Sequence, residues 1–148
     1  NIDFSKQTLI HYLRFIVGII FIYASFDKII NPLKFANAIS SYDFSVLIGA
    51  SFLDSFLALF LPWLELLLGL CMILGIYLDE ANDMIIGLLV FFIVMLYQAY
   101  FRGINLSDCG CGLNESTIGM DIFRDFILIF ICLLIKFRAL ILGRTYDR

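Results

Sequence analysis

The stretch Leu9–Ile30, LIHYLRFIVGIIFIYASFDKII, decides the fold of this chain. It is an apolar run long enough to cross a bilayer, which needs about 20 such residues. Within it, polar and small side chains recur at helical spacing and draw a stripe down one face of the predicted helix. The stripe consists of Arg14, Gly18, Phe21, Ser25 and Lys28. We expect this stripe to face other helices and not lipid.

The composition extends this interpretation to the whole chain. Of its 148 residues, 62% are hydrophobic and 16% are charged, whereas soluble domains are about half apolar and about a quarter charged. The sequence therefore predicts an integral membrane protein whose length suits one compact domain. The net charge of −3 offers no basic surface for nucleic acid, so we expect no nucleic-acid partner.

Three further apolar runs follow the first. They cover about 52–77, 84–101 and 118–142. Pro32 ends the first run, a polar turn at 79–83 separates the second from the third, and we expect a short interfacial helix at about 35–41. The sequence thus predicts an all-α integral membrane four-helix bundle, a single domain over residues 1–148, with both termini on one side.

Lysine and arginine near the helix ends predict the orientation of this bundle. The basic residues on the side of the termini are Lys6, Arg14, Lys136, Arg138, Arg144 and Arg148, and those on the other side are Lys28, Lys34 and Arg102. Because positive charge gathers on the cytoplasmic side, we expect cytoplasmic termini in a bacterial inner membrane. The segment between the third and fourth runs then faces the periplasm, where disulfides form and exchange.

That segment contains the stretch Asp108-Cys109-Gly110-Cys111-Gly112. A tight bend at Gly110 brings the two cysteines within the ~6.8 Å Cα separation that a disulfide allows. The small ring would be strained and easily reduced, which favours a redox-active pair. A purely structural staple is disfavoured because so short a loop gains little entropy when closed. Binding of a metal by the two thiolates, and inert thiols, stay open, although His11 is the only histidine and no zinc ligand set is evident.

Charged and polar side chains from all four predicted helices fall in the outer half of the bundle, beneath the cysteine loop. At a rise of ~1.5 Å per residue, Glu65 and Arg124 lie at similar depth, and we predict an ion pair between them. Lys28 lies near the outer end of the first predicted helix, and Gln98 lies about one turn below the outer end of the third. Two interpretations of the predicted ion pair stay open. In one it only fixes helix packing; in the other Arg124 stabilises a thiolate or a quinone oxygen. By contrast, Cys71 and Cys132 have no polar company in sequence, and we interpret both as small apolar residues.

Several motifs together resemble the MauE/DoxX membrane family. They are Phe21-Ile22-Tyr23-Ala24-Ser25-Phe26-Asp27-Lys28, Asn31-Pro32, Phe35-Ala36, Leu61-Pro62-Trp63-Leu64-Glu65-Leu66, Gly69, Arg102-Gly103, Asp108-Cys109-Gly110-Cys111 and Arg124-Asp125. The resemblance spans about Arg14 to Leu134. Many MauE-like proteins have an aromatic residue after the second cysteine, where this chain has Gly112-Leu113.

The resemblance implies a four-helix membrane protein tied to periplasmic redox maturation. MauE is associated with making the disulfide-rich subunit of methylamine dehydrogenase alongside a thioredoxin-like partner, and DoxX relatives with sulfur oxidation linked to quinone. The resemblance further implies that Cys109 and Cys111 are the redox pair and that Lys28, Glu65 and Arg124 are the charged motif positions.

Two functions follow as expectations. The first is a membrane thiol–disulfide oxidoreductase that exchanges electrons between a periplasmic thioredoxin-like protein and a membrane quinone. In it Cys109, Cys111, Glu65 and Arg124 carry the chemistry, and Lys28, Gln98 and Arg124 contact the quinone. The alternative is a non-catalytic membrane subunit or chaperone that holds a partner protein or a metal through the cysteine loop. We expect no metal cofactor in the first case.

Overall fold

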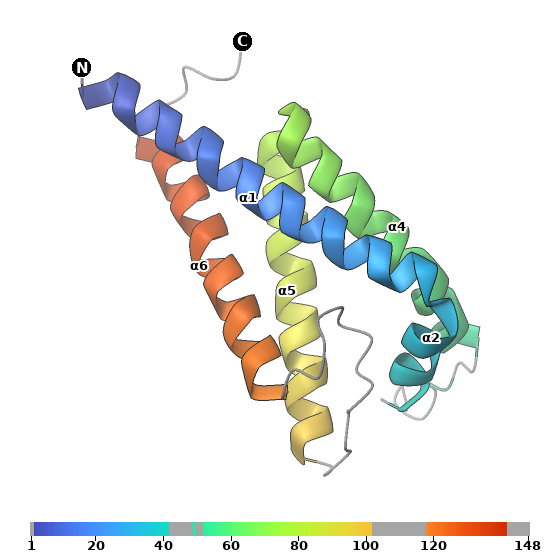
Figure 1. Ribbon diagram of the computed structural model, residues 1–148. Coiled ribbons are helices and arrows are strands. Elements are labelled where there is room, and N and C mark those ends of the chain that lie inside the picture. Colours follow the sequence, from blue (N-terminus) through green and yellow to red (C-terminus); the bar gives the residue numbers. More distant parts are fainter. Residues whose placement is uncertain (1, 42–48, 50–51, 102–117, 142–148) are drawn as a thin grey trace.

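The protein is almost entirely helical in the part that its computed structural model describes, residues 2–41, 49, 52–101 and 118–141 (Figure 1). Its helices are α1 (Ile2–Ile30), α2 (Pro32–Ser41), α4 (Phe52–Leu74), α5 (Leu78–Phe101) and α6 (Ile118–Ile141). No strand occurs within those ranges. The all-α prediction is confirmed, and the short helix expected at about 35–41 is α2, which begins directly at Pro32.

The four long helices alternate in direction and pack in a ring. Figure 1 shows α1 and α5 running one way and α4 and α6 the other. Helix α1 packs most extensively on α4 and also contacts α6, while α5 contacts both α4 and α6. Helix α2 packs against α4 next to the end of α1. The beginning of α1 and the end of α6 therefore lie toward the same end of the molecule.

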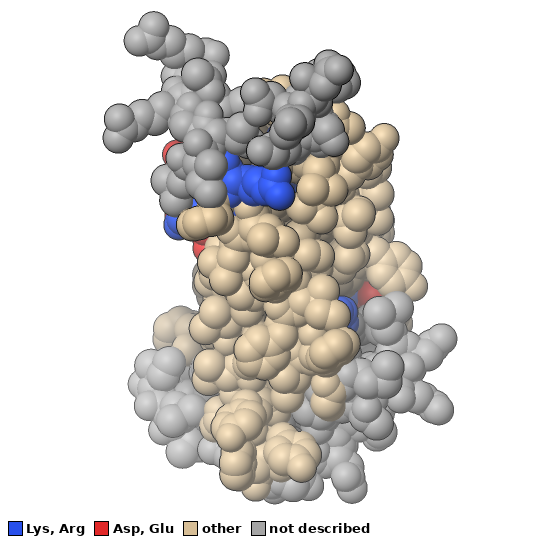
Figure 2. All heavy atoms as spheres, turned by 90° about the vertical axis from the view of Figure 1, so that its left-hand side faces the viewer, with Lys and Arg blue, Asp and Glu red and all other residues tan. Residues whose placement is uncertain are grey.

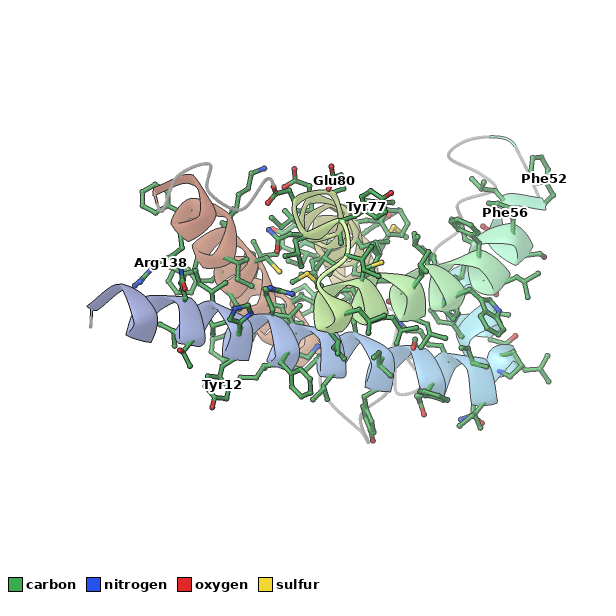
Figure 3. The ribbon with its side chains drawn as sticks, turned by 90° about the horizontal axis from the view of Figure 1, so that it is seen from above. Tyr12, Phe52, Phe56, Tyr77, Glu80 and Arg138 are labelled. Atoms are coloured by element: carbon green, nitrogen blue, oxygen red, sulfur yellow. The ribbon has the colours of Figure 1, made fainter. Side chains whose placement is uncertain are left out.

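Three of these helices are long and apolar enough to cross a membrane. Among the residues described, the candidate spans are Gln7–Ile30, Phe52–Leu74 and Leu78–Gln98. Large apolar side chains point outward, as Tyr12, Phe52 and Phe56 do in Figure 3. Figure 2 shows a face that is largely free of charge between the two ends of the molecule. The chain is thus a multi-pass membrane protein, and the predicted fourth span, α6, stays a prediction.

The predicted boundaries between the second and third runs were wrong. Helix α4 ends at Leu74 and not at Tyr77, because Gly75 takes a φ of 77° and its amide donates to the Cys71 carbonyl at 2.9 Å. Glycine adopts this left-handed conformation without steric cost. Helix α5 begins at Leu78, so residues 79–83, predicted as a polar turn between helices, instead lie in its first helical turns. Its acidic residues Asp79 and Glu80 suit the positive end of the helix dipole.

The stripe predicted on α1 is confirmed as an inward face. Arg14, Phe21, Ser25 and Lys28 are all at most 7% exposed. Gly18 meets Gly69 of α4 so closely that a Cβ at Gly69 would lie 2.9 Å from the Gly18 carbonyl oxygen. This contact between two glycines sets how α1 and α4 align along their length, and it positions the charged side chains described next.

Candidate functional site

Lys28 and Glu65 form an ion pair between α1 and α4. The Lys28 Nζ donates to both carboxylate oxygens of Glu65, at 2.7 and 3.0 Å. Their side chains are only 5% and 3% exposed. Side chains on a helix lean toward its N-terminus. Because α1 and α4 run in opposite directions, their side chains lean in opposite directions along the bundle. The Lys28 and Glu65 side chains therefore extend toward each other.

The predicted pairing of Glu65 with Arg124 was therefore wrong. Lys28 is the only cation within 4 Å of the Glu65 carboxylate in the part of the chain that the structure describes. Counting depth along separate helices placed Arg124 opposite Glu65, but it ignored the direction in which long side chains lean. It placed Lys28 near the surface, whereas the side chain reaches back into the bundle.

Two aromatic rings complete the surroundings of the Lys28 ammonium. Its Nζ lies 4.6 Å from the ring centroid of Phe92 on α5 and 5.1 Å from that of Phe35 on α2. A cation this close to an aromatic face is attracted by the negative charge density above the ring. Sequence analysis missed the role of both rings. The sequence does contain a signal for Phe92: it follows Ile85 and Leu89, both buried, at helical spacing, which predicts that it faces inward.

Arg124 and Asp125 form a second ion pair, within α6. The Nε and Nη2 atoms of Arg124 donate to Asp125 Oδ1 at 3.2 and 3.0 Å. Neighbouring residues on a helix point about 100° apart, so the arginine folds back across the helix to reach the carboxylate. Asp125 is 2% exposed, while the Arg124 side chain is 29% exposed. The sequence singled out Asp125 only as part of a motif, not as a site residue.

Both ion pairs line one small cavity. Its volume is about 50 Å³ and it is partly open. It is lined by Ile20, Phe21, Tyr23, Ala24, Lys28, Glu65, Leu89, Phe92, Arg124, Asp125 and Leu128. Tyr23, 59% exposed, is the exposed member, so the cavity opens beside it on α1. The structure thus brings together Lys28, Glu65 and Arg124, as predicted, whereas the half-buried Gln98 does not line the cavity.

The predicted redox pair, Cys109 and Cys111, lies outside the described residues. Its segment, 102–117, joins the end of α5 to the start of α6. Arg124 follows Ile118 by about 9 Å along α6, at ~1.5 Å per residue. The cavity is therefore near the end of the bundle to which the cysteine segment is attached.

The other two cysteines are free and pack with the core. Cys132 is fully buried in the main hydrophobic cluster, and Cys71 packs against that cluster. This agrees with their interpretation as small apolar residues. No group of three or more metal-binding side chains occurs among the residues that the structure describes.

Arg14, near the middle of α1, occupies a separate buried position beside the end of α4. Its Nη2 donates to the Met72 carbonyl at 3.1 Å, and its Nη1 lies 3.3 Å from Nδ1 of His11. The guanidinium thus satisfies a carbonyl in the last turn of α4, where the helix dipole favours positive charge. We assign Arg14 a role in holding α4 against α1.

Comparison with known proteins gives one family. Residues 6–138 match the family described as methylamine utilisation protein MauE. No curated protein matches the chain significantly, and neither does any solved structure.

Proposed function

Since this chain belongs to the MauE family of membrane proteins, we propose that it is a membrane thiol–disulfide oxidoreductase that works through Cys109 and Cys111. Its soluble reaction partner is a thioredoxin-like protein. We propose further that the cysteine loop faces the periplasm from the inner membrane, which the distribution of lysine and arginine supports.

The exchange proceeds by two thiolate attacks. The thiolate of Cys109 attacks the partner's disulfide, so that a mixed disulfide forms and one partner thiolate leaves. Cys111 then attacks Cys109 within the mixed disulfide and releases the second partner thiolate. Two electrons pass to the partner, which ends as a dithiol holding the two protons that the loop thiols gave up. The loop ends as a disulfide, and the same steps in reverse oxidise a reduced partner.

The observation that carries the proposal is the cysteine pair in the segment that joins α5 and α6. Leu89 and Phe92 of α5 and Arg124 and Asp125 of α6 line the charged cavity between these helices. A cation near a thiol favours its thiolate, and Arg124 is the cavity cation with appreciable exposure, 29%. We propose that Arg124 assists the loop cysteines in this way.

The family resemblance also implies a quinone, which when bound would supply an acceptor for two electrons and two protons. The cavity residues do not fit an enclosed quinone ring. A benzene ring occupies an engineered cavity of about 150 Å³, whereas this cavity measures about 50 Å³. Its two cations, Lys28 and Arg124, already donate to Glu65 and Asp125. We therefore assign no step of the exchange to a quinone in this cavity, and the quinone part of the proposal depends on the resemblance.

Trapping of the mixed disulfide tests the proposal. If Cys109 attacks and Cys111 resolves, Cys111→Ser should accumulate a covalent adduct with the thioredoxin-like partner that a reductant removes. Cys109→Ser should not accumulate one. Both variants are compared in cells that express the partner, by non-reducing gels and mass spectrometry. The double variant, which lacks both loop cysteines, controls for reaction at Cys71 and Cys132.

The alternative function predicts a different pattern. A membrane subunit or chaperone that holds a partner through the loop loses function similarly in both single variants and forms no covalent adduct in either. If neither Cys109→Ser nor Cys111→Ser yields a reductant-sensitive adduct with the partner present, the oxidoreductase proposal fails and the binding function replaces it.

A further inference from the structure

A single ammonium joins four helices at one end of the bundle. Lys28 belongs to the last turn of α1, and its Nζ donates to both carboxylate oxygens of Glu65 on α4, at 2.7 and 3.0 Å. The same atom lies 5.1 Å from the ring centroid of Phe35 on α2 and 4.6 Å from that of Phe92 on α5. We propose that Lys28 is a positioning residue, whose ammonium fixes α2 and the C-terminal half of α5 against the pair of α1 and α4.

Apolar packing alone does not determine this arrangement. The apolar cluster around these helices consists of Phe35 and Ile39 of α2, Leu61 of α4, and Met95 and Leu96 of α5. Lipid tails are as apolar as these side chains, so packing them together in a membrane gains little from the hydrophobic effect. Hydrophobic contact is also non-directional. The cluster by itself therefore favours no particular direction of α2.

The ammonium adds the geometric preference that the cluster lacks. A cation is attracted to the face of an aromatic ring and not to its edge, most strongly where water is excluded, and the Lys28 side chain is only 5% exposed. Phe35 and Phe92 must both present their faces to one point, and the two hydrogen bonds to Glu65 fix that point. Only Asn31 separates α1 from α2. This connection fixes where α2 begins, and the contact of Phe35 with the ammonium fixes its direction.

The helices that Lys28 organises carry both ends of the segment 102–117. Helix α5 leads into the segment, and Phe92 lies about 14 Å along the helix before Phe101. Helix α6 leads out of it, and its Ile122 packs against the same apolar cluster. Fixing α5 and α6 relative to each other fixes the distance that the segment bridges. We infer that Lys28 thereby holds the cysteine pair in position for exchange, and this part of the inference rests on the proposed function.

Hydrogen–deuterium exchange of the full chain in lipid nanodiscs, measured by mass spectrometry, tests the positioning of α2. The test variant is Lys28→Leu/Glu65→Gln, which removes both charges and keeps the apolar cluster. Leucine replaces lysine here because a methionine sulfur itself contacts aromatic rings favourably. We expect the amides of α2 to exchange about fivefold faster than in the wild type, which corresponds to the loss of one cation–aromatic contact of about 1 kcal/mol. Amides of α1 near Gly18, which contacts α4 directly, should keep their wild-type rates.

Two further variants separate the ammonium from general loosening of the fold. The control Asp83→Asn/Lys136→Leu removes an exposed ion pair of 2.6 Å and should leave the α2 amides unchanged. Phe35→Leu keeps the buried ion pair and removes the ring by which α2 contacts it, so it should speed the α2 amides as the test variant does. If the test variant fails to fold, Phe35→Leu decides. Wild-type rates of the α2 amides in the folded variants, or an equal increase in the control, would overturn the positioning of α2.

The kinetics of exchange with a thioredoxin-like protein test the link to function. Misplacing reacting groups by about 1 Å lowers a rate by up to about 100-fold, so we expect kcat of Lys28→Leu/Glu65→Gln to fall on the order of 10- to 100-fold. KM should not change, since both altered side chains are at most 5% exposed and do not contact the soluble partner. An unchanged kcat, or a change in KM alone, would refute the link. Absence of exchange in the wild-type protein would instead refute the proposed function, while the α2 amides still decide the positioning role.

Discussion

Removing one member of the Lys28–Glu65 pair should cost far more stability than removing both. Both side chains are at most 5% exposed, and two short hydrogen bonds join them. Breaking a buried ion pair costs about 3–5 kcal/mol because the remaining charge is left without a partner. We expect Lys28→Met to lower the free energy of unfolding by about 4 kcal/mol.

Glu65→Gln should cost less than Lys28→Met. In this variant the Lys28 ammonium keeps the faces of Phe35 and Phe92. If each ring contributes about 1 kcal/mol, the expected loss of stability is about 2 kcal/mol. The double variant Lys28→Met/Glu65→Gln leaves no buried charge at this position, and it should come within about 1 kcal/mol of the wild type. The expected order of stability is wild type, double variant, Glu65→Gln, Lys28→Met.

A double-mutant cycle measures these differences by equilibrium unfolding in mixed detergent micelles, followed by circular dichroism. The matched control is the exposed pair of Asp83 and Lys136, whose 2.6 Å contact lies at the surface. Exposed ion pairs contribute about 0–1 kcal/mol, so Asp83→Asn/Lys136→Met should show little coupling. If the stability losses of the two single buried variants simply add in the double variant, Lys28 and Glu65 are not coupled as proposed. A larger loss in Glu65→Gln than in Lys28→Met would refute the assigned role of the rings.

Three further predictions test the packing and the orientation. Gly69→Ala should destabilise the protein by about 1–3 kcal/mol, because its Cβ would lie 2.9 Å from a backbone oxygen of α1; thermal unfolding checks this. The control Gly87→Ala, with no atom within 4 Å of the new Cβ, should be neutral or stabilising. Arg14→Met should cost about 1.5–3 kcal/mol through loss of the charged donor to the Met72 carbonyl, in the same assay. A membrane-impermeant thiol reagent should label the reduced cysteine loop in intact cells or spheroplasts, and labelling only after the inner membrane is opened would reverse the proposed orientation.

The inward face of α1 could be predicted because helical spacing alone determines which residues share a face. Arg14, Ser25 and Lys28 are polar residues within an apolar run, and burial between helices satisfies them better than lipid does. The structure buries all three. The partner of a charge could not be predicted in the same way, because it depends on how two helices align along their length. The close approach of Gly18 and Gly69 sets that alignment. The sequence does not show that these two glycines are in contact.

Hydropathy alone does not locate the beginning of α5. The acidic residues Asp79 and Glu80 interrupt the apolar pattern and so predict a turn, yet acidic side chains favour the first turn of a helix. Asn82 is buried there and donates to the Cys132 carbonyl at 3.1 Å, a contact between helices that no spacing predicts. Gly75 was an available signal for the end of α4, since glycine commonly follows the last helical residue.

The same limit of hydropathy affects α6, the predicted fourth span. Hydropathy counts every charged residue as a separate penalty, but Arg124 and Asp125 neutralise each other by direct contact, which lowers the cost of burying both. Lys136 and Arg138 lie in the last turns, where long basic side chains reach the membrane surface. With 24 residues, α6 is about 36 Å long, enough for a hydrocarbon core of about 30 Å. It also packs against α1 and α5, both candidate spans. We therefore expect α6 to cross the membrane beside them, with its paired charges turned toward the cavity.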